Sequence, residues 1–175
     1  MKLVRYVSFV LAVMCCGFFA SAETDYILGP GDHLQIKVYG HDDLTSQVIL
    51  GSDGNIAMQF VGQIRASGKT PPQLADRIRQ GLAGDYIIDP IVSVIIARYR
   101  NFYIQGEVIR PSGYPYEPGM DVRKAIALAG GLTNRGSEDK VEWIPETSAD
   151  KNPQDVELSQ EIKPGDIIIV GQRFF

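Results

Sequence analysis

The chain has 175 residues, of which 45% are hydrophobic, and its formal net charge at pH 7 is −4. This length suits one medium domain or two small ones, and the hydrophobic content excludes general disorder. A nucleic-acid-binding protein usually carries a basic surface, so the acidic balance argues against a nucleic-acid partner.

The first residues predict a secretory signal peptide. Lys2 and Arg5 precede an apolar run, which is followed by small residues up to Ala22 and then by Glu23. A basic start, an apolar run and a small-residue site in that order are typical of a cleavable signal, so we expect cleavage between Ala22 and Glu23. The alternative is a membrane anchor, for which the apolar run is short.

Both cysteines lie inside this predicted signal. Cys15 follows Met14 and Cys16 follows Cys15, whereas a lipoprotein signal needs a small residue just before the cysteine. A chain cleaved after Ala22 would therefore carry neither a disulfide nor a thiolate metal site, and its fold would depend on packing alone.

Residues 23–100 are predicted as a first, strand-rich unit. It opens with a turn made of Gly29, Pro30, Gly31 and Asp32. Proline restricts φ, glycine tolerates positive φ and aspartate can bond its own backbone, which together favour a tight turn. Apolar and polar residues then alternate from residue 34 to residue 38, which indicates a half-buried strand.

A second short strand is expected at residues 48–50. Asp53 and Gly54 form a strong hairpin signal, and apolar residues alternate after it from Ile56 to Phe60. The pattern therefore predicts a hairpin between these two strands.

Residues 70–82 predict an amphipathic helix. Thr70 and Gln73 have the spacing of a capping box, in which each side chain bonds the backbone of the other residue. The apolar stripe of this helix comprises Leu74, Ile78 and Leu82. A strand rich in valine and isoleucine is expected next, over residues 91–97.

Residues 101–175 are predicted as a second small unit, so that the expected fold class is α+β. A strand is expected over residues 102–108 and a capped helix over residues 121–129, followed by a polar loop over residues 147–155. The other expected elements are a turn at Pro111, Ser112 and Gly113, a helix stop at Gly130 and Gly131, a strand at 141–144, and a turn at Pro164, Gly165 and Asp166 before a buried strand at 167–170.

The two turns that end in Asp32 and Asp166 are alike, because each has the order proline, glycine, aspartate and each precedes a strand. This echo suggests two related small units on either side of about residue 100. Chance recurrence of a common turn chemistry explains it equally well, and both interpretations stay open.

No catalytic, metal or cofactor site is predicted. The sequence lacks a nucleophile elbow, a zinc-protease motif and a phosphate-binding glycine loop. We interpret His33, at a strand start, as structural, and His41 with the two aspartates after it as a solvated turn. Glu138 and Asp139 are interpreted as part of a surface loop and not as a glycosidase pair.

A short basic and aromatic cluster follows the strand expected at residues 91–97. The candidate saccharide contacts in it are Arg98, Tyr99, Arg100 and Tyr103. Side chains of these types can hold a sugar chain by charge, hydrogen bonds and ring stacking. The alternative is a strand that joins the two units and carries ordinary solvated arginines.

Taken in order, these motifs resemble the outer-membrane polysaccharide export family. The first unit is similar to its polysaccharide export domain, and the second is similar to its soluble-ligand-binding β-grasp (SLBB) domain. The motif positions are Gly29, Pro30, Gly31, Asp32, Asp53, Gly54 and Gly62 in the first unit, and Gly106, Pro111, Gly113, Gly130, Gly131, Pro164, Gly165 and Asp166 in the second. Each motif is weak alone, but the ordered set is specific.

The resemblance implies a non-enzymatic subunit of an oligomeric ring, which exports capsular or exopolysaccharide without a cofactor. It implies a location in the periplasm in association with the outer membrane, and an inner-membrane polysaccharide co-polymerase as partner. Long family members span the outer membrane with a C-terminal amphipathic helix, for which this sequence has no pattern. We therefore expect a periplasmic ring that relies on a separate outer-membrane β-barrel.

Two other functions are compatible with a small secreted protein of this kind. The main alternative is a monomeric periplasmic module that binds a saccharide or another soluble ligand. A small hydrolase that acts on the polysaccharide is the second alternative, although the sequence offers no recognisable acid–base pair for it.

Overall fold

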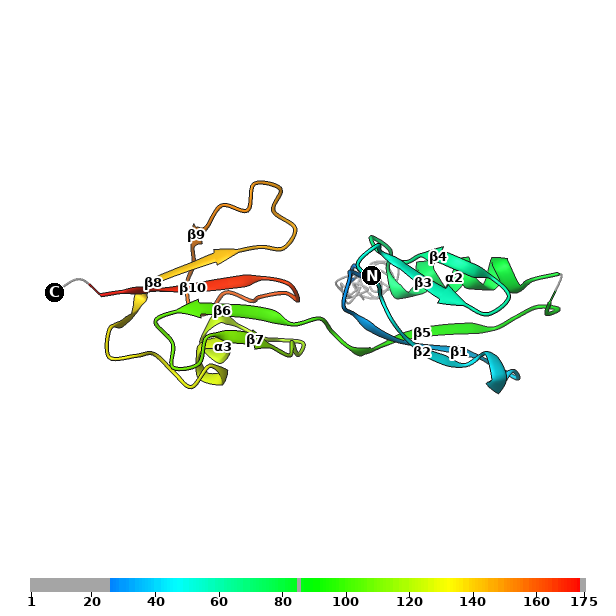
Figure 1. Cartoon of the computed structure of the whole chain (residues 1–175), viewed down its shortest axis with the longest axis horizontal. Coiled ribbons are helices and arrows are strands. Elements are labelled where there is room, and N and C mark those ends of the chain that lie inside the picture. The colour runs from blue at the N-terminus through cyan, green and yellow to red at the C-terminus, as the bar shows by residue number, and fades with distance from the viewer. Residues whose placement is uncertain (1–25, 85, 174–175) are drawn as a thin grey trace, which may run out of the picture.

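The computed structural model describes residues 26–84 and 86–173, and the chain has the predicted α+β fold class. The elements form two lobes that lie end to end and are joined by the segment between strands β5 and β6 (Figure 1). The predicted cleavage site between Ala22 and Glu23 lies outside the described residues.

The first lobe combines a sheet, a hairpin and an α-helix. Its three-stranded antiparallel sheet has the order β2-β1-β5, and β3 and β4 pair separately with each other. The elements are β1 (His33–Val38), the short 3-10 helix η1 (Asp42–Leu44), β2 (Ser46–Ile49), β3 (Asn55–Met58), β4 (Gly62–Arg65), α2 (Pro71–Leu82) and β5 (Val92–Arg98).

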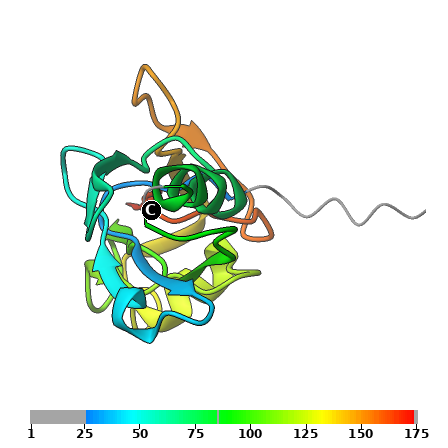
Figure 2. The same cartoon turned by 90° about the vertical axis from the view of Figure 1, so that its right-hand side faces the viewer.

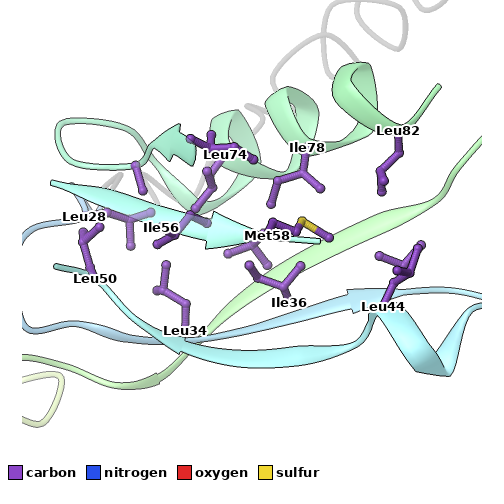
Figure 3. Packing of buried hydrophobic residues seen from close by; sticks show 14 residues of the cluster. Leu28, Leu34, Ile36, Leu44, Leu50, Ile56, Met58, Leu74, Ile78 and Leu82 are labelled. Atoms are coloured by element: carbon purple, nitrogen blue, oxygen red, sulfur yellow. The ribbon is translucent and has the colours of Figure 1, made fainter. Parts of the chain in front are cut away.

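The core of the first lobe lies between α2 and the sheet (Figure 3). The predicted apolar stripe of α2 is confirmed, since all three of its residues are fully buried. They point toward the sheet side of the core, with Ile56 and Met58 between the helix and β1 (Figure 3). Leu34 and Ile36 of β1 are buried at every second position, as the alternation predicts. Residues spaced by the helical period in α2 and by the strand period in β1 therefore pack into one core.

The predicted capping box at the start of α2 is confirmed. The backbone N–H of Gln73 donates to Thr70 Oγ1 at 3.4 Å, and the backbone N–H of Thr70 donates to Gln73 Oε1 at 3.1 Å. Two backbone groups that the helix itself cannot satisfy thus find partners, and the helix begins where the sequence predicts.

The hairpin predicted at Asp53 and Gly54 is wrong. Gly54 does sit in a turn, but β2 before it pairs with β1, and β3 after it pairs with β4. Phe60 also leaves the expected alternation, because it lies between β3 and β4 with a φ of 66° and an exposed side chain. A local signal reports that the chain turns, whereas the choice of strand partner depends on which faces are buried.

The second lobe is a mixed five-stranded sheet with one helix. The strand order is β7-β6-β10-β8-β9, with β6 parallel to β10 and the other neighbours antiparallel. The elements are β6 (Phe102–Gly106), β7 (Ser112–Tyr114), α3 (Val122–Leu128), β8 (Gly136–Ile144), β9 (Gln154–Asp155) and β10 (Ile167–Gln172). The segment between β8 and β9 extends away from the body of the lobe (Figures 1 and 2).

Helix α3 begins and ends close to the predicted positions. The backbone N–H of Lys124 donates to Asp121 Oδ1 at 2.7 Å, so Asp121 is the expected N-cap. Gly130 and Gly131 follow the helix with φ near 90°, and the backbone N–H of Gly131 returns to the carbonyl of Ile126. The helix covers one face of the sheet and shares its apolar core.

Three boundaries in the second lobe differ from the sequence prediction. Strand β8 is longer than the expected strand at 141–144, so Glu138 and Asp139 lie in a strand and not in a loop. Ser112 and Gly113 already belong to β7, and the expected loop over 147–155 ends in β9. β7 and β9 form because their backbones pair with β6 and β8, and the early part of β8 is joined to β10 through Gly136 and Gln172. Polar side chains do not prevent such pairing.

Gly106, at the end of β6, is the position of the second lobe where a side chain fits least. Its φ is 89°, and an added Cβ would overlap the carbonyl oxygen of Val170 in β10. Gly119 has a φ of 78°, but nothing lies within 4 Å of a Cβ added there. The two glycines therefore share the backbone conformation and differ in the space around it.

We expect Gly106→Ala to destabilise the protein more than Gly119→Ala, by about 1–3 kcal/mol, because only the first substitution adds overlap to backbone strain. Urea unfolding followed by far-UV circular dichroism measures the difference. Equal unfolding midpoints for the two variants would contradict the close approach of β6 and β10.

Candidate functional site at the junction of the lobes

The two proline-glycine-aspartate turns have the same geometry. Asp32 Oδ2 accepts from the backbone N–H of Gly29 at 2.9 Å, and Asp166 Oδ2 accepts from that of Lys163 at 2.8 Å. In both turns the aspartate N–H donates back to the carbonyl of the same partner residue at 3.2 Å. The sequence echo is thus also a structural one, and both aspartates are buried.

Asp32 is a carboxylate with 0% exposure, and it collects donors from both sides of the junction. The Tyr26 hydroxyl donates to its two oxygens at 2.8 Å each, and Gly29 N–H contributes a third contact. Arg100 adds its backbone N–H and its guanidinium, each at 2.9 Å. A buried charge is tolerated only when it is paired and hydrogen-bonded, and Asp32 meets both conditions.

Arg100 connects the first turn to the second. Its side chain is only 14% exposed and lies between Asp32 and Glu146, to which its Nε donates at 3.0 and 3.2 Å. The guanidinium Nη2 also pairs with Glu146. The backbone N–H of Glu146 in turn donates to Asp166 at 2.9 Å. We call Tyr26, Asp32, Arg100, Glu146 and Asp166 the junction network.

The electrostatics of this network keep its donors protonated. Burial, and then the hydrogen bond to Asp32, raise the pKa of Tyr26 far above the ordinary value of a phenol. Burial by itself lowers the pKa of Arg100, but hydrogen bonding to Glu146 and the negative charge of Asp32 outweigh it, and the pKa is raised. Arg100 is therefore a permanent cation between two carboxylates.

Aromatic rings add apolar contacts across the same junction. Tyr99 lies edge-on to Tyr26 of the first lobe at 4.9 Å between centroids, and edge-on to Tyr116 of the second lobe at 5.4 Å. Edge-to-face pairs of this kind favour one relative orientation of the rings. The joining segment is thus held by charge on one side and by ring packing on the other.

A cleft of about 490 Å³ opens beside the network, with walls from both lobes. Of the candidate saccharide contacts, Arg98, Tyr99 and Tyr103 line it together with Arg100. Arg100 makes two ion pairs there, whereas Tyr103 is 52% exposed. Sequence reasoning did not find the other lining residues, which include Pro30, His33, Asn101, Pro115 and Glu146.

Among the motif positions, Pro30, Gly31 and Gly165 line the cleft, and the others shape the fold. Asp53 accepts hydrogen bonds from Asn55, next to Gly54, and Gly62 begins β4. Gly113 lies under the Tyr103 ring, since an added Cβ would be 2.9 Å from its Cε1 atom. No group of three or more residues suited to metal binding occurs among the described residues. In the same part of the chain, no helix has the length and apolar character needed to cross a membrane.

Two family matches cover most of the chain in the order of the two lobes. The family described as "Polysaccharide biosynthesis/export protein" matches residues 20–97, and the "SLBB domain" family matches residues 101–145.

Similar proteins carry related names. The chain is 35% identical over 135 residues to the "Exopolysaccharide production protein ExoF" of Rhizobium meliloti, which covers 69% of this chain and 32% of that protein. It is 26% identical over 182 residues to the "EPS I polysaccharide export outer membrane protein EpsA" of Ralstonia nicotianae, a match that covers 89% of this chain and 48% of that protein. It is also 26% identical over 159 residues to the "Polysialic acid transport protein KpsD" of Escherichia coli, where the match covers 85% of this chain and 28% of that protein. The chain spans less than half the length of each of these relatives.

We expect Arg100→Met to cost about 3–5 kcal/mol of stability, because it leaves the buried Asp32 carboxylate without its counter-charge. The double variant with Asp32→Asn is expected to lose less than the sum of the two single variants. Urea unfolding of all three variants gives the coupling energy.

The matched control is Arg79→Met. In the wild type, Arg79 Nη2 lies 3.4 Å from Oδ1 of Asp76, and both side chains are exposed. An exposed ion pair contributes at most about 1 kcal/mol, so this variant should unfold close to the wild type. Equal losses for Arg79→Met and Arg100→Met, or strictly additive losses in the cycle, would show that the network does not hold the junction.

Proposed function

Because the chain combines an export domain with an SLBB domain and so belongs to the polysaccharide export family, we propose that it is a non-enzymatic part of an apparatus that exports capsular or exopolysaccharide. The observation that carries this proposal is the match of two families, in the family's order, to two successive lobes. The proposed boundaries are residues 23–100 for the export domain and 101–175 for the SLBB domain, after a signal peptide at 1–22.

We further propose that copies of the chain assemble side by side into a ring. A ring requires heterologous contacts, in which one face of a subunit meets a different face of the next. Three exposed apolar side chains on the first lobe support such a contact. The ring centroids of Phe60 and Tyr86, both about half exposed, lie 5.0 Å apart, and Ile88, two residues after Tyr86, is 94% exposed. We call these three residues the apolar patch. Exposed apolar side chains that gather in one place mark interaction sites.

The backbone conformation of Phe60 further supports this patch as an interaction site. A bulky residue with a φ of 66° costs on the order of 1–3 kcal/mol, and such strain persists where the surrounding structure or a function maintains it. Val61 maintains it here, because it packs so closely on α2 that a Cβ added to Gly81 would overlap its side chain. The hairpin thereby holds the Phe60 ring outward.

The proposed location is the periplasm, in association with the outer membrane, and the proposed partners are the polysaccharide and an inner-membrane co-polymerase. Two relatives support this choice by their names, one as an "outer membrane protein" and one as a transport protein for polysialic acid. A conduit wall needs weak, repeated contacts with its cargo and no bond-making group.

A monomeric ligand-binding module is the second candidate function, and the cleft beside the junction network is the observation in its favour. The two candidate functions imply particles of different mass, because a ring is many times heavier than the 19.3 kDa chain and a monomeric module is not.

We expect the purified protein to form a large closed assembly, and Ile88→Glu to reduce it to monomers, because the substitution places a charge in an apolar contact. Light scattering after size-exclusion chromatography measures the mass. The matched control is Ile109→Glu, the same substitution at a residue of 60% exposure in the second lobe. A wild-type monomer at every concentration would contradict the ring, and an Ile88→Glu variant that assembles normally would contradict the patch.

In the bacterium that carries this chain, deletion of its gene should abolish secretion of the polymer, and expression of the wild type should restore it. The quantity to measure is polysaccharide in the medium and on the cell surface. Undiminished secretion by the deletion strain would remove the basis of the export function.

A further inference from the structure

We propose that the cleft beside the junction network is a binding site for a short segment of an acidic saccharide, with Arg98 as its anion contact and Tyr103 as its stacking surface. This inference rests on the proposed export function and names the class of polymer that the conduit accepts.

The position and size of the cleft fit a ligand site. Its lining comes from the first turn (Pro30), from the joining segment (Tyr99, Asn101) and from the second lobe (Tyr103, Pro115). A volume of about 490 Å³ lies within the range of small-molecule sites, which occur preferentially where two domains meet. A polymer that passes along the wall would meet both lobes here.

The cleft contains polar groups that the protein does not use. Within residues 26–84 and 86–173, no hydrogen bond satisfies the side chains of Asn101 or Tyr103 or the hydroxyl of Tyr99. These are one amide and two hydroxyls, which can both donate and accept. Sugar hydroxyls need partners of this type, so the groups suit a saccharide better than an apolar ligand.

Tyr103 offers the cleft a flat apolar surface. Its side chain is 52% exposed, and one edge of its ring lies against Gly113 of β7, where any side chain would displace it. The glycine at this motif position therefore sets the orientation of an exposed ring. An aromatic ring with a hydroxyl at its end can stack on a sugar ring and bond its substituents.

One guanidinium in the cleft is available to an anion. Arg100 is not, because it pairs with both Asp32 and Glu146. Arg98 pairs with no carboxylate among the described residues, and its one recorded polar contact there is from Nη2 to His33 Nε2 at 2.6 Å. A guanidinium carries five N–H donors, which leaves enough of them for a bidentate bond to a carboxylate.

These features point to a uronate or another carboxylate-bearing sugar, held by Arg98 at one end and by the Tyr103 ring at the other. The contact is expected to be weak, since a conduit must release what it binds. Saturation-transfer NMR suits the test, because it detects weak ligands on a large assembly.

The experiment compares two probes of equal length on the full secreted chain. One is an oligosaccharide of glucuronic acid and N-acetylglucosamine, and the other is a neutral glucose oligosaccharide. We expect saturation transfer mainly to the acidic probe, with binding that weakens as salt is added. Arg98→Gln should weaken it about tenfold, the loss expected when a hydrogen bond to a charged group is removed.

Two further variants separate stacking from hydrogen bonding, and a third controls for surface charge. Tyr103→Ala should weaken the acidic probe more than Tyr103→Phe, which keeps the ring and loses only the hydroxyl. Arg77→Gln, on the exposed face of α2, should bind like the wild type. Circular dichroism confirms that each variant is folded before its binding is measured.

Equal binding of the two probes, or unchanged binding by Arg98→Gln, would overturn the assignment of an acidic saccharide. No saturation transfer from either probe, in a chain that assembles and supports secretion, would overturn the cleft site and leave the export function standing. A chain that binds the acidic probe but whose deletion leaves secretion intact would contradict the export function instead.

Discussion

A carboxylate without exposed surface, Asp32, governs how the two lobes meet. Taking this charge out of water is costly, so the fold has to supply a cation and several hydrogen-bond donors. The donors come from the same turn and from Tyr26, but the cation comes from Arg100, on the segment that leads into the second lobe. Because Arg100 also binds Glu146, whose backbone bonds Asp166, satisfying one buried group fixes both turns and the path between them.

This arrangement separates a structural role from a surface role within one short segment. Arg100 is largely buried and forms ion pairs with two carboxylates, while Arg98, two residues earlier, lines the cleft without a carboxylate partner among the described residues. Alternation along extended chain places neighbours at a spacing of two on the same side, but the chain leaves β5 at Arg98 and no longer follows that rule. Besides the ion-paired Arg100 and Glu146, the cleft therefore has one guanidinium without a carboxylate partner, Arg98, and one exposed ring, Tyr103. That composition suits transient contact.

The sequence predicted the elements whose causes are local. The capped helix α2, with Thr70 and its apolar stripe, and the strand β1 both follow from short-range patterns that tertiary contacts only reinforce. The hairpin at Asp53 and Gly54 failed because a turn signal carries no information about which strand will pair with which. Strand β8 was predicted too short for a related reason, since its early part is joined to β10 by the pairing of Gly136 with Gln172, beyond a register shift that no local pattern announces.

By itself the sequence determined the α+β class, the helices α2 and α3, the strand β1 and the two turns that end in Asp32 and Asp166, because these depend on periodicity, capping and turn chemistry within a few residues. It also marked Arg98 to Tyr103 as unusual. Only the tertiary structure decided that Arg100 is a buried counter-charge, that Glu146 is its partner 46 residues away, and that Arg98 and Tyr103 share a cleft. The physical reason is that burial and charge pairing are properties of groups brought together in space, and no local pattern encodes which distant group will arrive.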